Sequence, residues 1–96
     1  MTEQEKIIQK LKDAKNSLNK ENLIKSIGIF GSFSDGTYNS DSDVDILVDF
    51  EKPVGWKFFT LELYLEKILG RKVDLVTRNA LKKQIRDSIL NQVKYI

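Results

Sequence analysis

The chain contains no cysteine and no histidine, and it has only one proline among its 96 residues. Without cysteine and histidine, thiol nucleophiles, histidine acid–base catalysis and zinc sites of the usual type are excluded. Any catalysis must therefore use carboxylates, hydroxyls, lysines, arginines and a bound metal ion. The single proline, Pro53, stands close to Gly55, and together they predict a loop over residues 51–55.

An excess of charge of one sign is also missing. The 16 Lys and Arg residues are interspersed with 14 Asp and Glu residues, and the resulting net charge of +2 is too small to argue for direct nucleic-acid binding. No apolar run approaches the length of a membrane span, and no signal-peptide core follows Met1. We therefore expect a single cytoplasmic domain over residues 1–96, with no membrane attachment.

Hydrophobic periodicity predicts both helices and strands. Apolar residues at helical spacing indicate helices over 2–18, 56–69 and 79–95, and shorter apolar runs indicate strands over 24–30, 43–50 and 72–77. A polar break is expected at 19–22 and a short helix at 33–38. Thr2 and Glu5 have the spacing of a capping box, and Gly70 is placed to end the second long helix. This order predicts an α/β (α+β) fold with helices packed on a small mixed sheet.

Two of the helices carry apolar residues with distinct expected roles. The core face of helix 56–69 is expected to contain Phe58, Leu61, Leu65, Ile68 and Leu69. A second face of the same helix, with Trp56, Phe59 and Leu63, is either additional core or a surface for a partner. The apolar stripe expected in helix 79–95 contains Leu81, Ile85, Ile89 and Val93.

The segment 30–50 carries the residues with the clearest chemical meaning. Gly31 ends an apolar strand at a point where glycine permits a tight turn, and Ser32 follows it. Asp43 and Asp45 alternate with apolar residues, so both leave one face of a strand with their Cα atoms about 6.5 to 7 Å apart. A divalent cation would resolve the repulsion between two such carboxylates. Taken alone, the pair is also compatible with a hydrated strand edge.

Two other motifs fail on the same segment. A calcium loop beginning at Asp41 would have Ile46 in place of its glycine and Lys52 in place of its glutamate. A phosphate-binding P-loop could use Gly31 and Gly36 as its glycines. It would then have Thr37 and Tyr38 where Lys and Ser or Thr are required.

A Gly-Ser pair after one apolar strand, followed by Asp43-x-Asp45 at the start of the next, resembles the signature of metal-dependent nucleotidyltransferases of the polymerase-beta superfamily. Nearly the whole chain resembles the minimal nucleotidyltransferase (MNT) domains of that superfamily. These domains are the antitoxins of two-gene systems in which the toxin is a HEPN-domain ribonuclease. The resemblance therefore implies a polymerase-beta-like nucleotidyltransferase fold.

The resemblance also implies a set of site residues. Asp43, Asp45 and Asp74 would be catalytic and would bind two Mg²⁺ ions, with Mn²⁺ as an alternative, while Gly31 and Ser32 would hold the phosphates of ATP. Taken alone, Asp74 is also compatible with an edge-strand charge or with a salt bridge to a neighbouring basic residue, Arg71 or Lys72. The family role requires Asp74 to share a sheet face with the other two carboxylates.

The acceptor implied by the resemblance is a tyrosine of a partner HEPN toxin, which would be inactivated when AMP is transferred to it. A domain this small has no evident second lobe to recognise another acceptor. One alternative is a non-catalytic antitoxin that masks its toxin by binding alone. A weaker alternative is nucleotidyl transfer to a small molecule or an RNA end.

The chain departs from the family pattern directly after the Gly-Ser pair. Many relatives carry arginines before the next glycine, whereas this chain has Phe33, Ser34 and Asp35. A carboxylate beside a triphosphate repels it, so Asp35 is expected to weaken nucleotide binding unless its side chain points outward.

Overall fold

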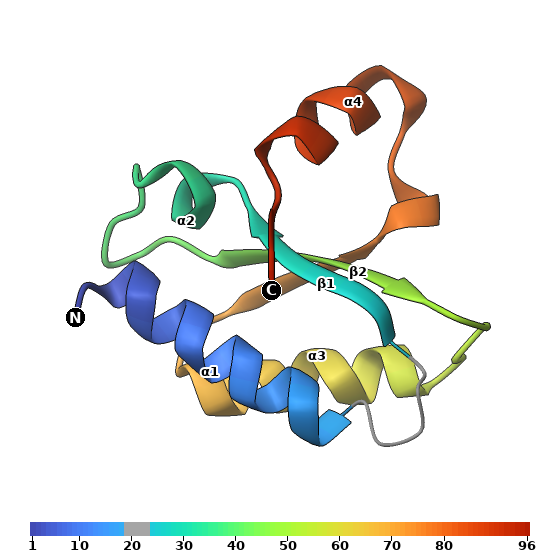
Figure 1. The fold of residues 1–96 in the computed structure, drawn as a ribbon, viewed down its shortest axis with the longest axis horizontal. Coiled ribbons are helices and arrows are strands. Elements are labelled where there is room, and N and C mark those ends of the chain that lie inside the picture. The colour runs from blue at the N-terminus through green and yellow to red at the C-terminus, as the bar shows by residue number, and fades with distance from the viewer. Residues whose placement is uncertain (19–23) are drawn as a thin grey trace.

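A computed structural model describes residues 1–18 and 24–96 (Figure 1). The expected polar break at 19–22 lies outside the described residues. The helices are α1 (Glu3–Leu18), α2 (Ser32–Asp35), α3 (Lys57–Leu69), the 3-10 helix η2 (Arg78–Ala80) and α4 (Lys83–Gln92). The strands are β1 (Ile24–Phe30), β2 (Val44–Phe50), β3 (Val73–Thr77) and β4 (Lys94–Tyr95).

The strands form one mixed sheet in the order β3-β2-β1-β4. β1 is antiparallel to both β2 and β4, and β2 is parallel to β3. The parallel pair requires a crossover, and α3 supplies it between β2 and β3. The predicted α/β fold with a small mixed sheet is therefore confirmed. Within the described part of the chain, no helix combines the length and apolar character needed to cross a membrane.

Alternation along the strands divides the sheet into two different faces. Val44, Ile46 and Val48 of β2 are fully buried in the main core, to which α1 contributes Leu11 and α3 contributes Leu65. Figure 1 shows α1 and α3 on this side of the sheet and α4 on the other. Fully burying each such aliphatic side chain stabilises the fold by about 1.5 to 3 kcal/mol. The face that α1 and α3 do not cover carries the alternate residues of the strands.

The predicted helix ends are present. Thr2 Oγ1 accepts a hydrogen bond from the Glu5 backbone N–H at 3.1 Å, and Glu5 Oε1 accepts one from the Thr2 N–H at 3.2 Å, so the capping box is confirmed. α3 ends at Gly70 in the left-handed conformation, at φ 66°. The second apolar face of α3 is not additional core, because Trp56, Phe59 and Leu63 are all exposed.

The C-terminal helix is shorter than predicted. The chain leaves α4 at Val93, which has extended dihedrals, and residues 94–95 pair with β1 as strand β4. Gly28 makes this pairing possible, because a Cβ atom there would lie 2.6 Å from Val93 Cγ1 and 2.8 Å from the Lys94 carbonyl oxygen. The predicted apolar stripe is correspondingly wrong in part. Leu81 is buried, but Ile85 is 47% exposed.

The short helix after Gly31 is also displaced from its predicted range of 33–38. It begins at Ser32 and ends at Asp35, because Gly36 adopts the left-handed conformation at φ 84° and donates its N–H to the Ser32 carbonyl oxygen. Glycine takes up this conformation without the steric cost that a side chain would add.

The free edge of β3 is covered by carboxylates of α3. Val73 donates its backbone N–H to Glu66 Oε2 at 3.0 Å, and Leu75 donates its N–H to Glu62 Oε2 at 3.2 Å. Unpaired N–H groups at a sheet edge invite pairing with another chain, so these two contacts both block the edge and attach α3 to it.

Replacing Glu66 with alanine should lower the free energy of unfolding by about 1 to 2 kcal/mol, because the Val73 N–H loses a charged acceptor. Glu66→Gln keeps an acceptor oxygen and should lose less. Urea denaturation measures both variants, with Glu51→Ala, at an exposed position outside the helices and strands, as the control. Equal stability of Glu66→Ala and Glu51→Ala would contradict this role.

Candidate active site

Gly31 forms the turn between β1 and α2 and lies against Asp45. Its backbone has φ 68°, and a Cβ atom at this position would lie 2.3 Å from Asp45 Oδ2. No other residue fits here without moving the carboxylate, and none adopts the dihedrals as easily. The glycine predicted to permit a tight turn therefore has a second role, because it lets backbone and carboxylate approach each other closely.

Asp45 and Asp74 lie side by side on neighbouring strands. They are register partners in the parallel pairing of β2 with β3, so their side chains leave the same face of the sheet. Their chain neighbours Val44, Ile46, Val73 and Leu75 are buried in the core on the opposite face. The requirement that Asp74 share a face with Asp45 is met, and Asp43 stands immediately before β2.

The electrostatic environment of Asp45 includes the charges of the other two carboxylates. Burial raises the pKa of Asp45 above its ordinary value of 3.8, and the negative charges of Asp74 and then Asp43 raise the pKa further. Asp43 and Asp74 are exposed, whereas Asp45 is half-buried. Ionised Asp45 is therefore unfavourable unless a positive charge joins the group.

The loop that carries Gly31 and Ser32 is attached to the C-terminal part of the chain. Gln92, the last residue of α4, accepts the Gly31 N–H through Oε1 at 3.2 Å, and its main-chain oxygen accepts a bond from the Ser34 hydroxyl. Phe33 is fully buried and stacks on Tyr38, with ring centroids 4.4 Å apart. The three residues after Ser32 thus include two that anchor α2, Phe33 and Ser34.

Asp35 is directed to its own loop. Its Oδ1 accepts bonds from the Thr37 hydroxyl at 2.6 Å and from the Thr37 N–H at 3.0 Å. The bond from the Thr37 hydroxyl is the main reason that the pKa of Asp35 is lowered, followed by the bond from the Thr37 N–H. The carboxylate is exposed and closes the turn after α2. The sequence predicts that Asp35 weakens nucleotide binding unless its side chain points outward. The exposed carboxylate is bonded to its own loop, so the condition for that weakening is not met.

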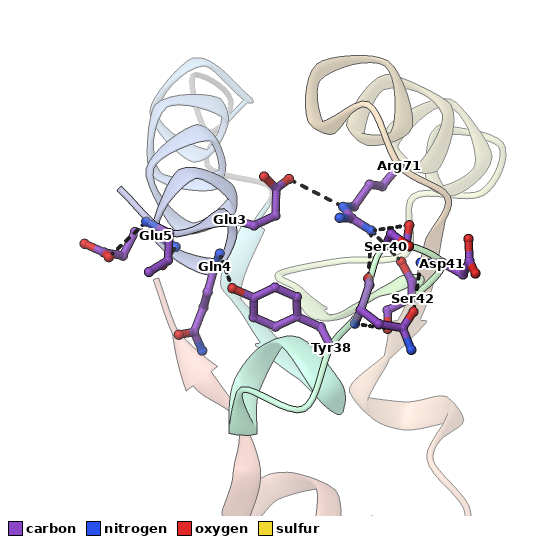
Figure 2. Close-up of polar contacts among 10 residues, drawn as sticks. Glu3, Gln4, Glu5, Tyr38, Ser40, Asp41, Ser42 and Arg71 are labelled. Atoms are coloured by element: carbon purple, nitrogen blue, oxygen red, sulfur yellow. Dashed lines mark hydrogen bonds and ion pairs between the residues drawn. The ribbon is translucent and has the colours of Figure 1, made fainter.

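Arg71 is a part of this region whose contacts the sequence did not predict (Figure 2). Its place in the sequence suggests only an ion pair with Asp74, but its side chain pairs with Glu3 of α1 at 3.4 Å. It also donates to backbone carbonyl groups of the segment 39–42, directly before Asp43. An arginine next to a helix-ending glycine has no sequence pattern that indicates such contacts.

The donor chemistry of the site suits a hard divalent cation. Carboxylate oxygens are the protein ligands that Mg²⁺ prefers, and Asp45 and Asp74 already lie on adjacent strands. Within residues 1–18 and 24–96, no three acidic side chains are gathered closely enough to enclose a metal ion. The carboxylates fit such an ion by type, and binding would require the side chains to converge.

Sequence comparison assigns the family. Residues 8–96 match the nucleotidyltransferase domain family. The chain belongs to this family. The nucleotidyltransferase is 50% identical over 74 residues to a protein adenylyltransferase named MntA from Thermococcus cleftensis, a match that covers 76% of this chain and 75% of the relative.

Solved structures extend the similarity to three dimensions. A candidate minimal nucleotidyltransferase matches 91% of this chain and 90% of its own with a TM-score of 0.76 and 31% identity. A toxin–antitoxin structure with AMP-PNP matches 96% of this nucleotidyltransferase and 70% of the other chain, with a TM-score of 0.70 and 29% identity. The predicted resemblance to minimal nucleotidyltransferases is confirmed.

A third solved structure includes a modified toxin. It is a complex of tri-AMPylated HEPN toxin from Shewanella oneidensis with its MNT antitoxin. The match covers 97% of this nucleotidyltransferase and 67% of the other chain, with a TM-score of 0.62 and 26% identity.

The raised pKa of Asp45 predicts that replacing this carboxylate with a neutral side chain stabilises the protein by an amount that depends on pH. The folded protein holds the Asp45 proton more tightly than the unfolded chain does. The stability that this protonation gives to the wild-type protein is fully present below pH 3.8 and is lost as the pH rises through the folded-state pKa. In EDTA, Asp45→Asn should therefore raise the Tm at about pH 7, and the gain should shrink toward zero near pH 3.5. Thermal melts at both pH values test this.

The matched control for this melt is Asp87→Asn, which neutralises an exposed carboxylate on α4. It should not reproduce the gain, because Asp87 is not among the charges that raise the pKa of Asp45. A lower Tm for Asp45→Asn than for the wild type at neutral pH would show that the ionised carboxylate does not destabilise the fold.

Proposed function

We propose that this nucleotidyltransferase is a protein adenylyltransferase, which transfers AMP from ATP to a hydroxyl group of a partner protein. The observation that carries the proposal is the pairing of Asp45 with Asp74 directly beside the Gly31 turn. This arrangement puts two carboxylates, of the type that binds a divalent cation, next to backbone groups suited to phosphate. The membership of the family supports the same reaction class.

Each residue of the site has an assigned task. The backbone around Gly31 and the Ser32 hydroxyl hold the phosphates of ATP, and a phosphate oxygen replaces Gln92 Oε1 as the acceptor of the Gly31 N–H. Asp43, Asp45 and Asp74 would bind two Mg²⁺ ions, with Mn²⁺ as an alternative. Bound there, the metal would offset the triphosphate charge and lower the pKa of the attacking hydroxyl.

The transfer is a displacement at the α-phosphorus of ATP. The acceptor hydroxyl oxygen forms a bond to this phosphorus, the bond from phosphorus to the bridging oxygen breaks, and pyrophosphate leaves with the electron pair. The hydroxyl proton passes to the solvent, which reaches this side of the site because Asp74 is exposed. The exposure of Asp43 and Asp74 leaves room for an acceptor presented by another molecule.

We assign a tyrosine of a HEPN-domain toxin as the acceptor and neutralisation of that toxin as the consequence. Two comparisons support the assignment, since the Thermococcus cleftensis relative is named as a protein adenylyltransferase and the Shewanella oneidensis HEPN toxin carries AMP groups in its complex. ATP as the donor is supported by the AMP-PNP in the second solved structure.

Ligand binding can be tested without the partner. Mg²⁺ and ATP together should raise the Tm of the wild-type protein, because ligands that bind only the folded state stabilise it by mass action. Asp43→Asn should abolish the rise, whereas Asp41→Asn, which changes an exposed neighbour in the preceding loop, should retain it. A wild-type Tm that does not respond to both ligands would count against the site.

Transfer itself is tested by intact-mass spectrometry. Incubation with the cognate HEPN protein, ATP and Mg²⁺ should add about 329 Da to the partner for each AMP group transferred, as adenylylation of a hydroxyl requires. Tyrosine-to-phenylalanine variants of the partner identify the acceptor. The Asp43→Asn, Asp45→Asn double variant should fold, because it removes charge repulsion, and should transfer nothing.

The outcomes of this experiment separate three functions. If the partner is silenced in a stoichiometric complex without any gain in mass, the protein is a masking antitoxin and not an enzyme. Labelled AMP found on RNA ends or on a small molecule, with an unmodified partner, would move the acceptor to a different class.

A further inference from the structure

Arg71 connects the two chain segments that supply the exposed carboxylates of the site. It follows Gly70 at the end of α3 and lies shortly before Asp74 on β3. Its side chain reaches the segment 39–42, which leads into Asp43 (Figure 2). Asp43 and Asp74 are thus linked through one residue, although they are far apart in the sequence.

The guanidinium group holds that segment by its backbone. Nη1 lies 3.2 Å from the carbonyl oxygens of Ser40 and Ser42 and 3.4 Å from that of Asn39. Contacts to carbonyl groups depend on the path of the chain and not on its side chains. Arg71 therefore constrains the backbone immediately before Asp43.

Other contacts fix the orientation of the guanidinium. Nε lies 3.4 Å from Glu3 Oε1, and Cζ lies over the Phe33 ring at 5.0 Å from its centroid. The Arg71 side chain is only 18% exposed. With Nε, Nη1 and one face engaged in this way, it is placed to hold the segment 39–42 in position.

The segment 39–42 has internal bonds that let it be held as a unit. Asn39 donates its N–H to Ser42 Oγ at 2.9 Å, and Asp41 donates its N–H to Asn39 Oδ1 at 2.8 Å. On the far side of Asp43, Val44 donates its N–H to the Lys72 carbonyl oxygen at 2.9 Å. Asp43 therefore stands between one point held by Arg71 and another held by the next residue, Lys72.

We propose that Arg71 is a positioning residue, which holds Asp43 near Asp74 and thereby sets the affinity of the carboxylates for a divalent cation. This inference rests on the proposed function. Asp45 lies in register beside Asp74, and Asp43 immediately precedes the same strand, so like charges act to separate these segments when no cation is bound. Arg71 opposes that separation from outside the site, without neutralising the carboxylates that must bind the metal.

Arg71→Lys tests the proposal because it keeps the charge and removes the planar guanidinium, which contacts the segment 39–42 through Nη1 and Glu3 through Nε at the same time. The half-saturating concentration of Mg²⁺, or of Mn²⁺ alone, in a titration of the Tm should rise about tenfold, as is typical when a residue supporting metal ligands is lost. Arg78→Lys is the matched control, because Arg78 is exposed and lies beyond the opposite end of β3. It should leave the metal titration unchanged.

Glu3→Ala provides a second variant if Arg71→Lys folds poorly. It removes the carboxylate that orients the guanidinium and should shift the metal titration in the same direction by a smaller factor. Hydrogen exchange at the Ser42 amide, which donates to the Asn39 carbonyl oxygen, should accelerate in both variants and not in Arg78→Lys.

The two readouts distinguish failure of this inference from failure of the proposed function. If the wild type responds to metal and the folded Arg71→Lys protein responds at the same concentration, Arg71 has no positioning role. If the wild type does not respond to Mg²⁺ or Mn²⁺ at all, the metal site of the proposed function is overturned, and the role of Arg71 falls with it.

Discussion

The repulsion between carboxylates on paired strands is the constraint on which the rest of this structure depends. Parallel pairing of β2 with β3 puts Asp45 directly beside Asp74, and Asp43 enters the same group from the preceding loop. Like charges held together cost free energy, which the folded protein must offset elsewhere. The offset comes from the opposite face, where the neighbouring residues of the same strands are buried against α1 and α3.

Glycine positions adapt the backbone to this arrangement. Gly31 lets the turn after β1 lie against the Asp45 carboxylate, and Gly28 lets the C-terminal strand approach β1. At each position a single Cβ atom would collide with its neighbour. The turn beside the carboxylates therefore depends on the missing side chain at Gly31. The return of the chain after α4 depends on the missing side chain at Gly28.

The long elements and the carboxylate face could be predicted from the sequence because they follow from local patterns. The alternation around Asp43 and Asp45 determines which residues share a strand face, and the apolar spacing of α1 and α3 determines which sides are buried. The capping box of α1 and Gly70 after α3 are local signals as well. The C-terminal strand could not be predicted in this way, since residues 94–95 are defined by pairing with β1.

By itself, the sequence determined that Asp43 and Asp45 share a strand face, that a turn follows β1 at Gly31, and the order of the elements, because periodicity and glycine conformation act over a few neighbouring residues. The tertiary structure decided that Asp45 faces Asp74 in register, that Asp35 turns back to Thr37, and that Arg71 holds the segment before Asp43. These features depend on hydrogen bonds and charges between groups whose relative positions exist only after the strands have paired. No local pattern of residues encodes a distance between two separate segments.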